Sequence, residues 1–286
     1  MLGGALSPEA ADALPDRLHE TEPEAAIGLT LREVRQAAGF RGSLNEVKLA
    51  PGHYSAWLEL HIEQGPLLER EGLDCGIVTA IAGPSSYRFT VEGFGGHAGA
   101  LLMPDRRDAL CAAAELVLAI ETAALAANTR SGASDTVATV GKLDVYPGAV
   151  NSVPSRVNFM LDLRDIDTSR REAVLNEVRL AARTVEAKRG VRITVEFINA
   201  DEPATSDAHL VQVLEAACRS EGASVRHLIS RAYHDTTFMA RVAPVAMLFI
   251  PCRGGVSHRP DEYAAPEAIA KGVAVLAQAL AQLSLE

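Results

Sequence analysis

The chain has 286 residues, 48% of them hydrophobic, and a formal net charge of -10 at pH 7. This length can bury one large core or two modest ones, and we expect two domains. The acidic balance, with a sequence pI near 5.3, argues against a nucleic-acid partner, because such proteins carry a clustered basic surface. We find neither an apolar run that predicts a membrane span nor a basic signal region in the opening MLGGALSPEAADALPD, and we expect a soluble cytoplasmic protein with no membrane partner.

The first element that suggests a site is a short apolar run near residue 55. The preceding residues mix Ala, Glu and Pro, with one helical pattern over 29–38 and no convincing strand. The run SAWLELHI, residues 55–62, ends at Glu63-Gln64-Gly65-Pro66, which predicts a buried strand with polar groups at its carboxyl end. α/β enzymes place their chemistry at such strand ends.

Residues 77–200 carry a self-contained pattern of six elements. Alternating apolar residues and turn signals predict a strand near 87–93, a helix over 105–127, strands near 136–145 and 156–164, a helix over 169–189 and a strand over 191–198. The order β-α-β-β-α-β is that of the ferredoxin-like unit, an antiparallel sheet with two helices on one face.

The α/β pattern resumes after residue 200. It predicts a helix over 209–220, the loop SRAYHDTTFMA, a strongly apolar strand over 245–251 and a closing helix over 266–283. We therefore expect an α/β fold with one discontinuous domain, residues 1–76 and 201–286, and an inserted ferredoxin-like α+β domain at residues 77–200.

Four of the eight histidines stand in short polar segments: His61, His97, His234 and His258. Neutral imidazole near strand ends and acidic neighbours suits zinc or manganese, but two histidines without carboxylates form an incomplete site. Each histidine also has a structural interpretation. The segment around His97 is equally a tight turn that needs glycine, Asp235 can cap a helix beside His234, and His258 can lie in an exposed loop.

Three further polar positions are candidates. Arg164 ends the strand pattern VNFMLDLR beside Asp162 and Asp165, so it forms either a surface ion pair or a bidentate clamp on a substrate carboxylate. Asn151 lies in a turn between two strands, and Gly254 lies in a loop where main-chain amides can approach a ligand. Walker, GxGxxG, GxSxG and HExxH motifs are absent from the sequence, so nucleophile-based hydrolysis finds no support.

Five segments in order resemble the family of allantoate amidohydrolases and N-carbamoyl-L-amino-acid hydrolases: LHIEQGPLLE, GFGGHAGALLMPDRRDA, PGAVNSVPSRVNFMLDLRD, AYHDTTFMA and FIPCRGGVSHRPDEY. The resemblance runs from end to end of the chain. It implies kinship with aminoacylases and glutamate carboxypeptidase-type metallopeptidases, which share a catalytic α/β domain and an inserted ferredoxin-like domain. The implied activity is metal-dependent hydrolysis of a linear amide or ureido C–N bond, in allantoate or an N-carbamoyl-L-amino acid.

The resemblance implies a metal centre in the discontinuous domain. His61 and His258 would each bind one ion of a dinuclear zinc or manganese centre, with Gln64 facing the substrate. His234 would contact the substrate, and the loop around Gly254 would supply a main-chain contact.

The inserted domain would contribute three residues to the same site. By resemblance, Asn151 and Arg164 hold the substrate carboxylate, and His97 is the catalytic residue that polarises the scissile carbonyl. In the family, His97 and Asn151 would reach the partner subunit's site. A homodimer is therefore the expected functional unit.

The opening of the chain departs from the family pattern. Family members carry an earlier segment with a His ligand, a bridging Asp and a Glu-Glu pair, and nothing before His61 matches it. Met1-Leu2-Gly3-Gly4 instead resembles the stretch after that pair, and His19 lies in a solvated helix pattern. We therefore expect an N-terminally truncated catalytic domain with little activity and weak metal binding by itself. The alternatives are a noncatalytic dimerisation or binding remnant and one half of a split enzyme.

Overall fold

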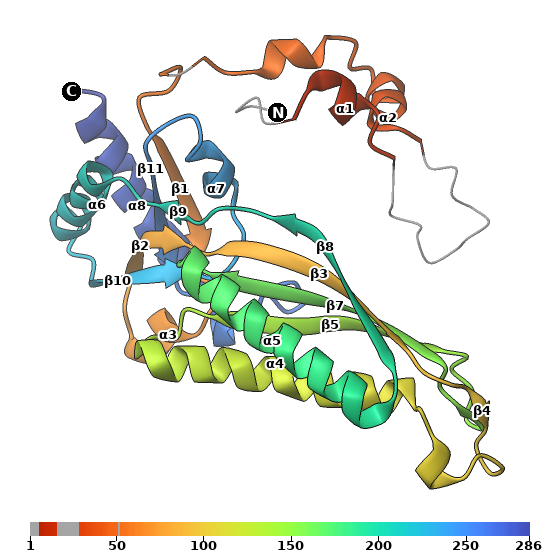
Figure 1. The fold of residues 1–286 in the computed structure, drawn as a ribbon. Helices are drawn as coiled ribbons and strands as arrows, with labels where there is room; N and C mark the ends of the chain where they lie inside the picture. The colour runs from red at the N-terminus through yellow and green to blue at the C-terminus, as the bar shows by residue number, and fades with distance from the viewer. Residues whose placement is uncertain (1–5, 16–28, 51) are drawn as a thin grey trace.

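A computed structural model of the protein describes residues 6–15, 29–50 and 52–286. Its first part contains the helices α1 (Pro8–Asp12) and α2 (Leu31–Ala37) and the 3-10 turn η1 (Leu44–Val47) (Figure 1). α2 confirms the helix expected over 29–38 and begins at a capping box between Thr30 and Glu33. Met1-Leu2-Gly3-Gly4 and His19, on which the expected truncation partly rested, lie outside the described residues.

The first sheet combines strands from both ends of the chain. Its order is β1-β11-β2-β10, and β9 pairs with β2. β1 runs parallel to β11 and β10 parallel to β2, whereas β11 and β2 are antiparallel. The bounds are Trp57–Ile62 for β1, Cys75–Ile81 for β2, Ala204–Thr205 for β9, Val225–Ser230 for β10 and Val245–Ile250 for β11.

Apolar layers cover both faces of this sheet. All six residues of β11 are buried, and alternate residues of the strand enter two separate hydrophobic clusters. α6 (Ala208–Ser220) and α8 (Pro266–Leu283) pack on one face, and Leu68 of the short α3 (Leu67–Glu71) packs on the other. α6, α8 and β11 confirm the elements expected there.

The second sheet is the expected ferredoxin-like unit. Its order is β5-β7-β3-β8, and every neighbouring pair is antiparallel. Both long helices lie on one face of it (Figure 1). The bounds are Gly83–Glu92 for β3, Ala109–Ser131 for α4, Val137–Tyr146 for β5, Arg156–Asp165 for β7, Thr168–Arg189 for α5 and Arg192–Ala200 for β8. A small ribbon of β4 (Gly96–His97) and β6 (Ser152–Val153), with the 3-10 turn η2 (Met103–Asp105), extends from its far end.

The alternation of β7 determines what each face of this sheet presents. Val157, Phe159, Leu161 and Leu163 are buried in the core beneath α4 and α5. The residues between them, which include Asp162 and Arg164, therefore point to the opposite, helix-free face. That face is where the candidate substrate residues of the inserted domain lie.

The change from one sheet to the other falls later than expected. We placed the boundary after Gly76, but β2 continues to Ile81 within the first sheet, and β3 begins at Gly83. Only Ala82 separates the two strands, and the turn-like Gly83-Pro84-Ser85-Ser86 that follows it lies within β3, so the local pattern did not show where one strand ends and the next begins. β2 was not predicted for this reason and β9 because it has only two residues, and the six-residue β10 was not predicted either.

α4 corrects the expectation about apolar runs. It is long and apolar enough to cross a membrane by length and composition alone. In the fold, however, Ala113, Leu116 and Ile120 face the sheet and are buried in the core of the ferredoxin-like unit.

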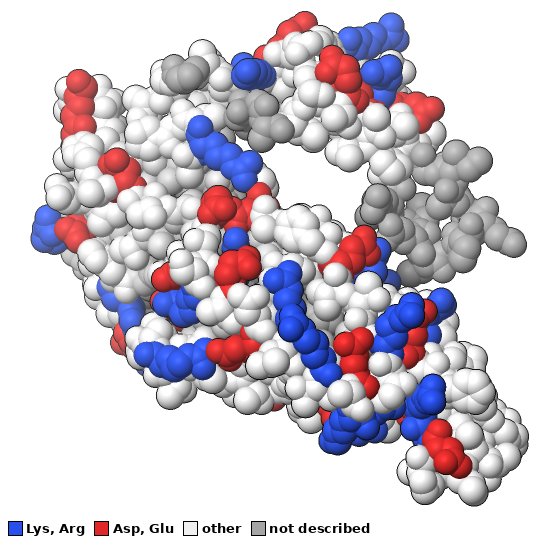
Figure 2. All heavy atoms as spheres, viewed as in Figure 1, with Lys and Arg blue, Asp and Glu red and all other residues white. Residues whose placement is uncertain are grey.

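Charges of both signs are mixed on the outer surface of this unit. On the face shown in Figure 2, Lys and Arg side chains alternate with Asp and Glu. Arg130 of α4 pairs with Glu177 of α5 at 2.7 Å, and Lys188 of α5 pairs with Glu115 of α4 at 2.9 Å. These ion pairs tie the two helices together at the surface.

Candidate metal and substrate site

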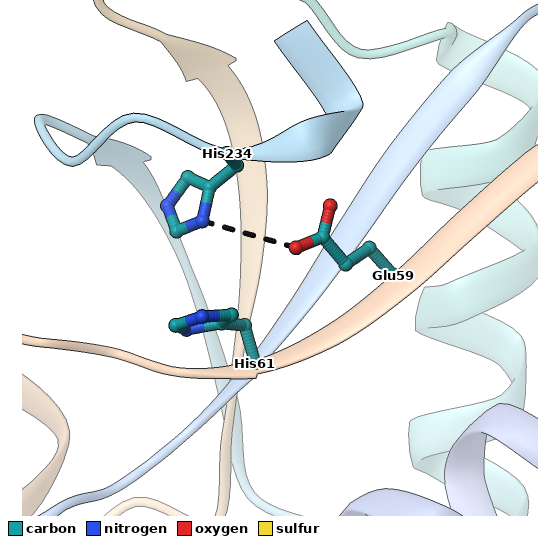
Figure 3. Close-up of side chains that lie close together, drawn as sticks. All are labelled: Glu59, His61 and His234. Carbon is teal, nitrogen blue, oxygen red and sulfur yellow. Dashed lines mark ion pairs between the residues drawn. The ribbon is translucent and has the colours of Figure 1, made fainter. Parts of the chain in front are cut away.

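The carboxyl end of β1 brings three possible metal ligands together. Glu59 and His61 are two residues apart in WLELHI, so the pleat puts both on one face of the strand. His234 joins them from the loop before α7 (Asp235–Met239). The ligand atoms of these three side chains lie within 4.8 Å of one another, and the side chains turn toward a common point (Figure 3).

The Glu59 carboxylate is held by the start of α7. Its Oε2 atom accepts hydrogen bonds from the Thr236 main-chain N–H at 3.0 Å and from the Thr236 hydroxyl at 2.5 Å. The Trp57 indole N–H donates to the same hydroxyl at 3.0 Å. The other oxygen of Glu59, Oε1, faces His234 and lies 3.9 Å from the Nδ1 atom of that imidazole.

The two imidazoles are arranged to offer lone pairs. The Nδ1 of His61 lies 2.8 Å from the Ile62 carbonyl oxygen, which can only accept, so Nδ1 donates and Nε2 is the nitrogen that can bind a metal. His234 is 5% exposed, and its Nε2 lies 2.7 Å from the Ser230 hydroxyl. Burial, and then the charge of His61, lower the pKa of His234 to about 4. His234 is therefore neutral at neutral pH, as a metal ligand must be.

One carboxylate and two imidazoles form a donor set that fits a divalent cation such as zinc or manganese. Three protein ligands also match a catalytic site, which keeps a position for water or substrate. His61 was predicted as a metal ligand and His234 as a substrate contact, and the structure puts them side by side, with ring centroids 4.8 Å apart.

His258 lies outside this cluster. It follows the 3-10 turn η3 (Arg253–Gly255), is exposed, and has a φ of 58°, while its N–H donates to Glu262 Oε2 at 3.0 Å. A hydrogen bond from Ser257, then the His258 N–H, and then the charges of His258 and His61 lower the pKa of Glu262. The Glu262 carboxylate therefore lies in the field of both predicted metal-binding histidines.

Gln64 connects the end of β1 to the His258 loop. Its Nε2 donates to the Ser257 hydroxyl at 2.8 Å, and its φ is 53°, in the left-handed region. Its Oε1 atom is buried and has no hydrogen-bond partner among the described residues. A buried acceptor without a partner costs free energy unless a ligand or water pairs with it, which is consistent with the predicted substrate contact.

The Arg164 guanidinium is occupied by its own strand. Nε and Nη2 donate to the two oxygens of Asp162 at 2.7 and 2.8 Å, and Nη1 donates to the Arg231 carbonyl at 3.1 Å. The ion pair of the structural interpretation is therefore present. Yet Arg164 and Asp162 also line a cavity of about 510 Å³ on the helix-free face, together with Arg231.

His97 and Asn151 lie together, but far from His61. His97 pairs with Ser152 in the β4–β6 ribbon, and the Ala98 N–H donates to the Asn151 carbonyl at 2.8 Å. Both side chains are exposed at the tip of the unit, whereas β1 lies at the opposite end of the molecule (Figure 1). Within one chain they cannot act on a ligand bound at His61.

Gly254 makes an internal contact. Its N–H donates to Glu69 Oε2 at 2.6 Å, and its φ of 63° suits glycine. At Gly255 a Cβ would lie 2.7 Å from the Gly65 carbonyl carbon, so the loop packs directly on the end of β1. The predicted main-chain contact from Gly254 to a substrate would have to replace the bond to Glu69.

Sequence reasoning missed Glu59. The signal was present, because period-2 alternation in a strand puts residues 59 and 61 on one face. Glu63 drew attention instead, but its two carboxylate oxygens accept the N–H groups of Leu67 and Leu68, each at 2.8 Å. Glu63 thus caps α3 and is not available to a metal in this arrangement.

A profile of the peptidase family M20/M25/M40 matches residues 10–282. The chain belongs to this family. The expected resemblance is confirmed, since an N-carbamoyl-L-amino acid amidohydrolase of Geobacillus stearothermophilus is 38% identical over 284 residues, which cover 99% of this chain and 66% of that protein. The family is one of hydrolases, and the relatives of this chain are named for hydrolysis of C–N bonds other than peptide bonds.

Other M20/M25/M40 relatives carry a different substrate name. A ureidoglycolate hydrolase of Arabidopsis thaliana is 49% identical over 259 residues, which cover 89% of this chain and 54% of that protein. The crystal structure of AtUAH in complex with (S)-hydroxyglycine superposes with a TM-score of 0.84 at 46% identity, over 100% of this chain and 66% of that one. The chain thus spans about half the length of these curated ureidoglycolate hydrolases. Our motifs had suggested allantoate or a carbamoyl amino acid only.

Proposed function

We propose that the protein hydrolyses the C–N bond of a ureido or carbamoyl group on a small carboxylate, with ureidoglycolate as the first candidate substrate. The observation that carries the proposal is the cluster of Glu59, His61 and His234 at the end of β1, in a chain with relatives named for this chemistry. Allantoate and N-carbamoyl-L-amino acids remain the second candidates, from relatives at lower identity.

For ureidoglycolate the proposed reaction balances as a simple hydrolysis. Water adds to the ureido carbonyl carbon, and the bond from that carbon to the substituted nitrogen breaks. The nitrogen takes up a proton and leaves as hydroxyglycine. The other product is carbamate, which decomposes to ammonia and carbon dioxide. Hydroxyglycine is the molecule named in the complex of the AtUAH relative.

The residues of the first sheet would hold the cation and place the substrate. Glu59, His61 and His234 would bind one divalent ion, and His258 would serve a second ion beside Glu262. A bound divalent cation polarises a carbonyl and acidifies a water molecule. The unpaired Oε1 of Gln64 would accept an N–H from the ureido group, because it has no other partner among the described residues.

The residues of the inserted domain would recognise the rest of the substrate. Arg164 would bind the carboxylate from the cavity on the helix-free face. His97 and Asn151 would act in the site of a partner subunit, because both are exposed at the tip and far from His61 of their own chain. We therefore propose a homodimer of a soluble cytoplasmic enzyme.

The outer face of α4 supports the proposed dimer. Leu118 and Leu125 are 62% and 61% exposed on one stripe of the helix. Thr122 and Thr129 continue the stripe, and their hydroxyls donate to the Leu118 and Leu125 carbonyls at 2.8 and 2.9 Å. The stripe therefore presents methyl groups, and an apolar surface of this kind is typical of a subunit interface.

The substrate assignment is tested by parallel assays of the full gene-encoded protein, loaded with zinc or manganese. Ammonia release is measured from ureidoglycolate, allantoate and several N-carbamoyl-L-amino acids, beside a His61→Ala variant. We expect the highest kcat/KM for ureidoglycolate and loss of activity in the variant. Preference for a carbamoyl amino acid would move the assignment to that substrate, and activity retained by His61→Ala would contradict the proposed centre.

A further inference from the structure

We infer that Asp162 positions the Arg164 guanidinium for the substrate carboxylate, so that carboxylate recognition depends on this pair of side chains. The inference rests on the proposed function, in which Arg164 binds that carboxylate. It assigns a role to Asp162 as a positioning residue that does not itself touch the substrate.

The position of Asp162 and Arg164 in β7 brings their side chains together. Asp162 and Arg164 are two residues apart in an unbroken strand, so both side chains rise from the helix-free face. The Asp162 oxygens accept from Nε at 2.7 Å and from Nη2 at 2.8 Å, a side-on bidentate contact. Arg164 and Asp162 are 28% and 39% exposed, so water screens the pair only in part.

A second contact fixes the other end of the guanidinium. Nη1 donates to the Arg231 carbonyl at 3.1 Å, across the space between the two sheets. The side chain of Arg231 in turn donates from Nε to the Ser134 carbonyl at 2.6 Å. The loop that carries His234 is thus tied to the inserted domain at Arg231, through its main chain to Arg164 and through its side chain to Ser134.

The remaining hydrogen-bond capacity of Arg164 defines where a carboxylate can bind. A guanidinium has five N–H groups, and three are used by Asp162 and Arg231. One N–H remains on each terminal nitrogen. Both nitrogens belong to the side chain that lines the cavity of about 510 Å³, so a substrate carboxylate can bind there without displacing Asp162.

Asp162 could act in two opposite ways, and the geometry favours one. As a competitor it would occupy the fork that the substrate needs. As a positioning residue it immobilises a long side chain before the substrate arrives, which lowers the entropy lost on binding. Because Asp162 and Arg231 together leave one N–H on each terminal nitrogen, the contact with Asp162 orients the guanidinium and does not block it.

The two roles predict opposite effects of Asp162→Asn. Steady-state rates are measured for ureidoglycolate and for its uncharged carboxamide, with Asp144→Asn as the control, since Asp144 is a half-buried aspartate of the neighbouring strand β5 paired with Lys142. We expect Asp162→Asn to raise KM for the carboxylate about tenfold and to leave KM for the carboxamide unchanged. Asp162→Glu, which keeps the charge, should recover part of the loss. A merely structural role would affect both substrates alike.

A binding measurement gives a readout without turnover. Glyoxylate is titrated into the 286-residue chain, and the Arg164 Nε–H signal is followed by 15N NMR. In the wild-type chain this signal should stay in place while the Nη signals shift, and in Asp162→Asn the glyoxylate affinity should fall about tenfold. Urea unfolding of each variant checks that the fold is kept.

The outcomes separate this inference from the proposed function. A lower KM, or tighter glyoxylate binding, in Asp162→Asn would show competition and overturn the positioning role, and so would an unchanged value. If Arg164→Ala raises KM steeply while Asp162→Asn has no effect, only the present inference fails. If Arg164→Ala has no effect on the carboxylate, or wild-type chain does not bind glyoxylate, the proposed carboxylate site itself is wrong.

Discussion

The Nδ1 atom of His234 lies 3.9 Å from Oε1 of Glu59, although the whole second sheet separates the two residues along the chain. The contact exists because β1 lies beside β11 and the start of α7 binds the Glu59 carboxylate through Thr236. A cation bound there would therefore link the segment before the second sheet to the segment after it.

Glu59→Gln should weaken metal binding. The amide keeps the size of the side chain but removes the charge that offsets a dication, so the zinc affinity should fall at least ~10-fold. Isothermal titration of zinc into the 286-residue chain measures this. Glu196→Gln, at an ion-paired glutamate of β8, is the control and should leave the affinity unchanged. Equal affinities in Glu59→Gln and wild type would remove Glu59 from the proposed site.

Mixing two inactive variants should restore activity if the site is shared between subunits. His61→Ala destroys the proposed metal site of its own chain, and His97→Ala destroys the contribution to the partner. Half of the randomly mixed dimers combine both chains, and each has one intact site, so about a quarter of wild-type activity should return. The mixture is assayed after reversible dissociation, with sedimentation to verify the dimers. No recovery from well-formed mixed dimers would place His97 in its own subunit's site or outside any site.

Asp165→Asn should destabilise the inserted domain and make its unfolding free energy less dependent on pH in acid. The buried Asp165 carboxylate accepts from Arg170 Nε at 2.7 Å, from the Thr136 hydroxyl at 2.5 Å and from the Asp167 N–H at 2.8 Å. Burial alone would raise its pKa, but these hydrogen bonds outweigh burial and lower it. Removal of the charge should cost about 3 kcal/mol of unfolding free energy at pH 7.

The sign of the pH effect follows from the lowered pKa. The stabilisation by Asp165 is complete above the pKa of an unfolded aspartate, near ~4, and is lost as the pH falls through the lower folded value. Urea unfolding of wild type should therefore show stability falling below about pH 4, and Asp165→Asn should show a shallower fall. Asp144→Asn, at a half-buried aspartate whose side chain contacts water, should behave as wild type. Parallel acid curves for wild type and Asp165→Asn would contradict the assignment.

Gly83→Ala should disturb the crossing between the two sheets. A Cβ at Gly83 would lie 2.4 Å from the Asp201 carbonyl oxygen and 2.7 Å from the Pro203 nitrogen, so the entering and leaving chains would have to separate. The expected loss of unfolding free energy is about 1–3 kcal/mol. Gly141→Ala in β5 meets nothing within 4 Å and is the matched control. A Gly83→Ala variant with the melting temperature of Gly141→Ala would show that the backbone between the two sheets can accommodate a Cβ at residue 83.

The sequence by itself determined the ferredoxin-like unit and the segments that carry chemistry. Alternation in residues such as Val157, Phe159 and Leu161 predicts a one-sided strand, and the helices on either side have their own periodicity and caps. The polar end of β1 and the loop that carries His234 were also visible as local patterns. The family resemblance added roles to these residues, because its motifs are contiguous in the chain.

The tertiary structure alone decided which of these residues meet. It joined Glu59 to His61 and His234, left His258 in a separate loop beside Glu262, and put His97 at the far tip of the molecule. It also showed that β2 crosses the expected domain boundary and pairs with β10 and β11. The physical reason is that a pattern of period 2 or 3.6 determines which face of an element is buried, whereas strand order and loop position depend on packing between elements distant in sequence.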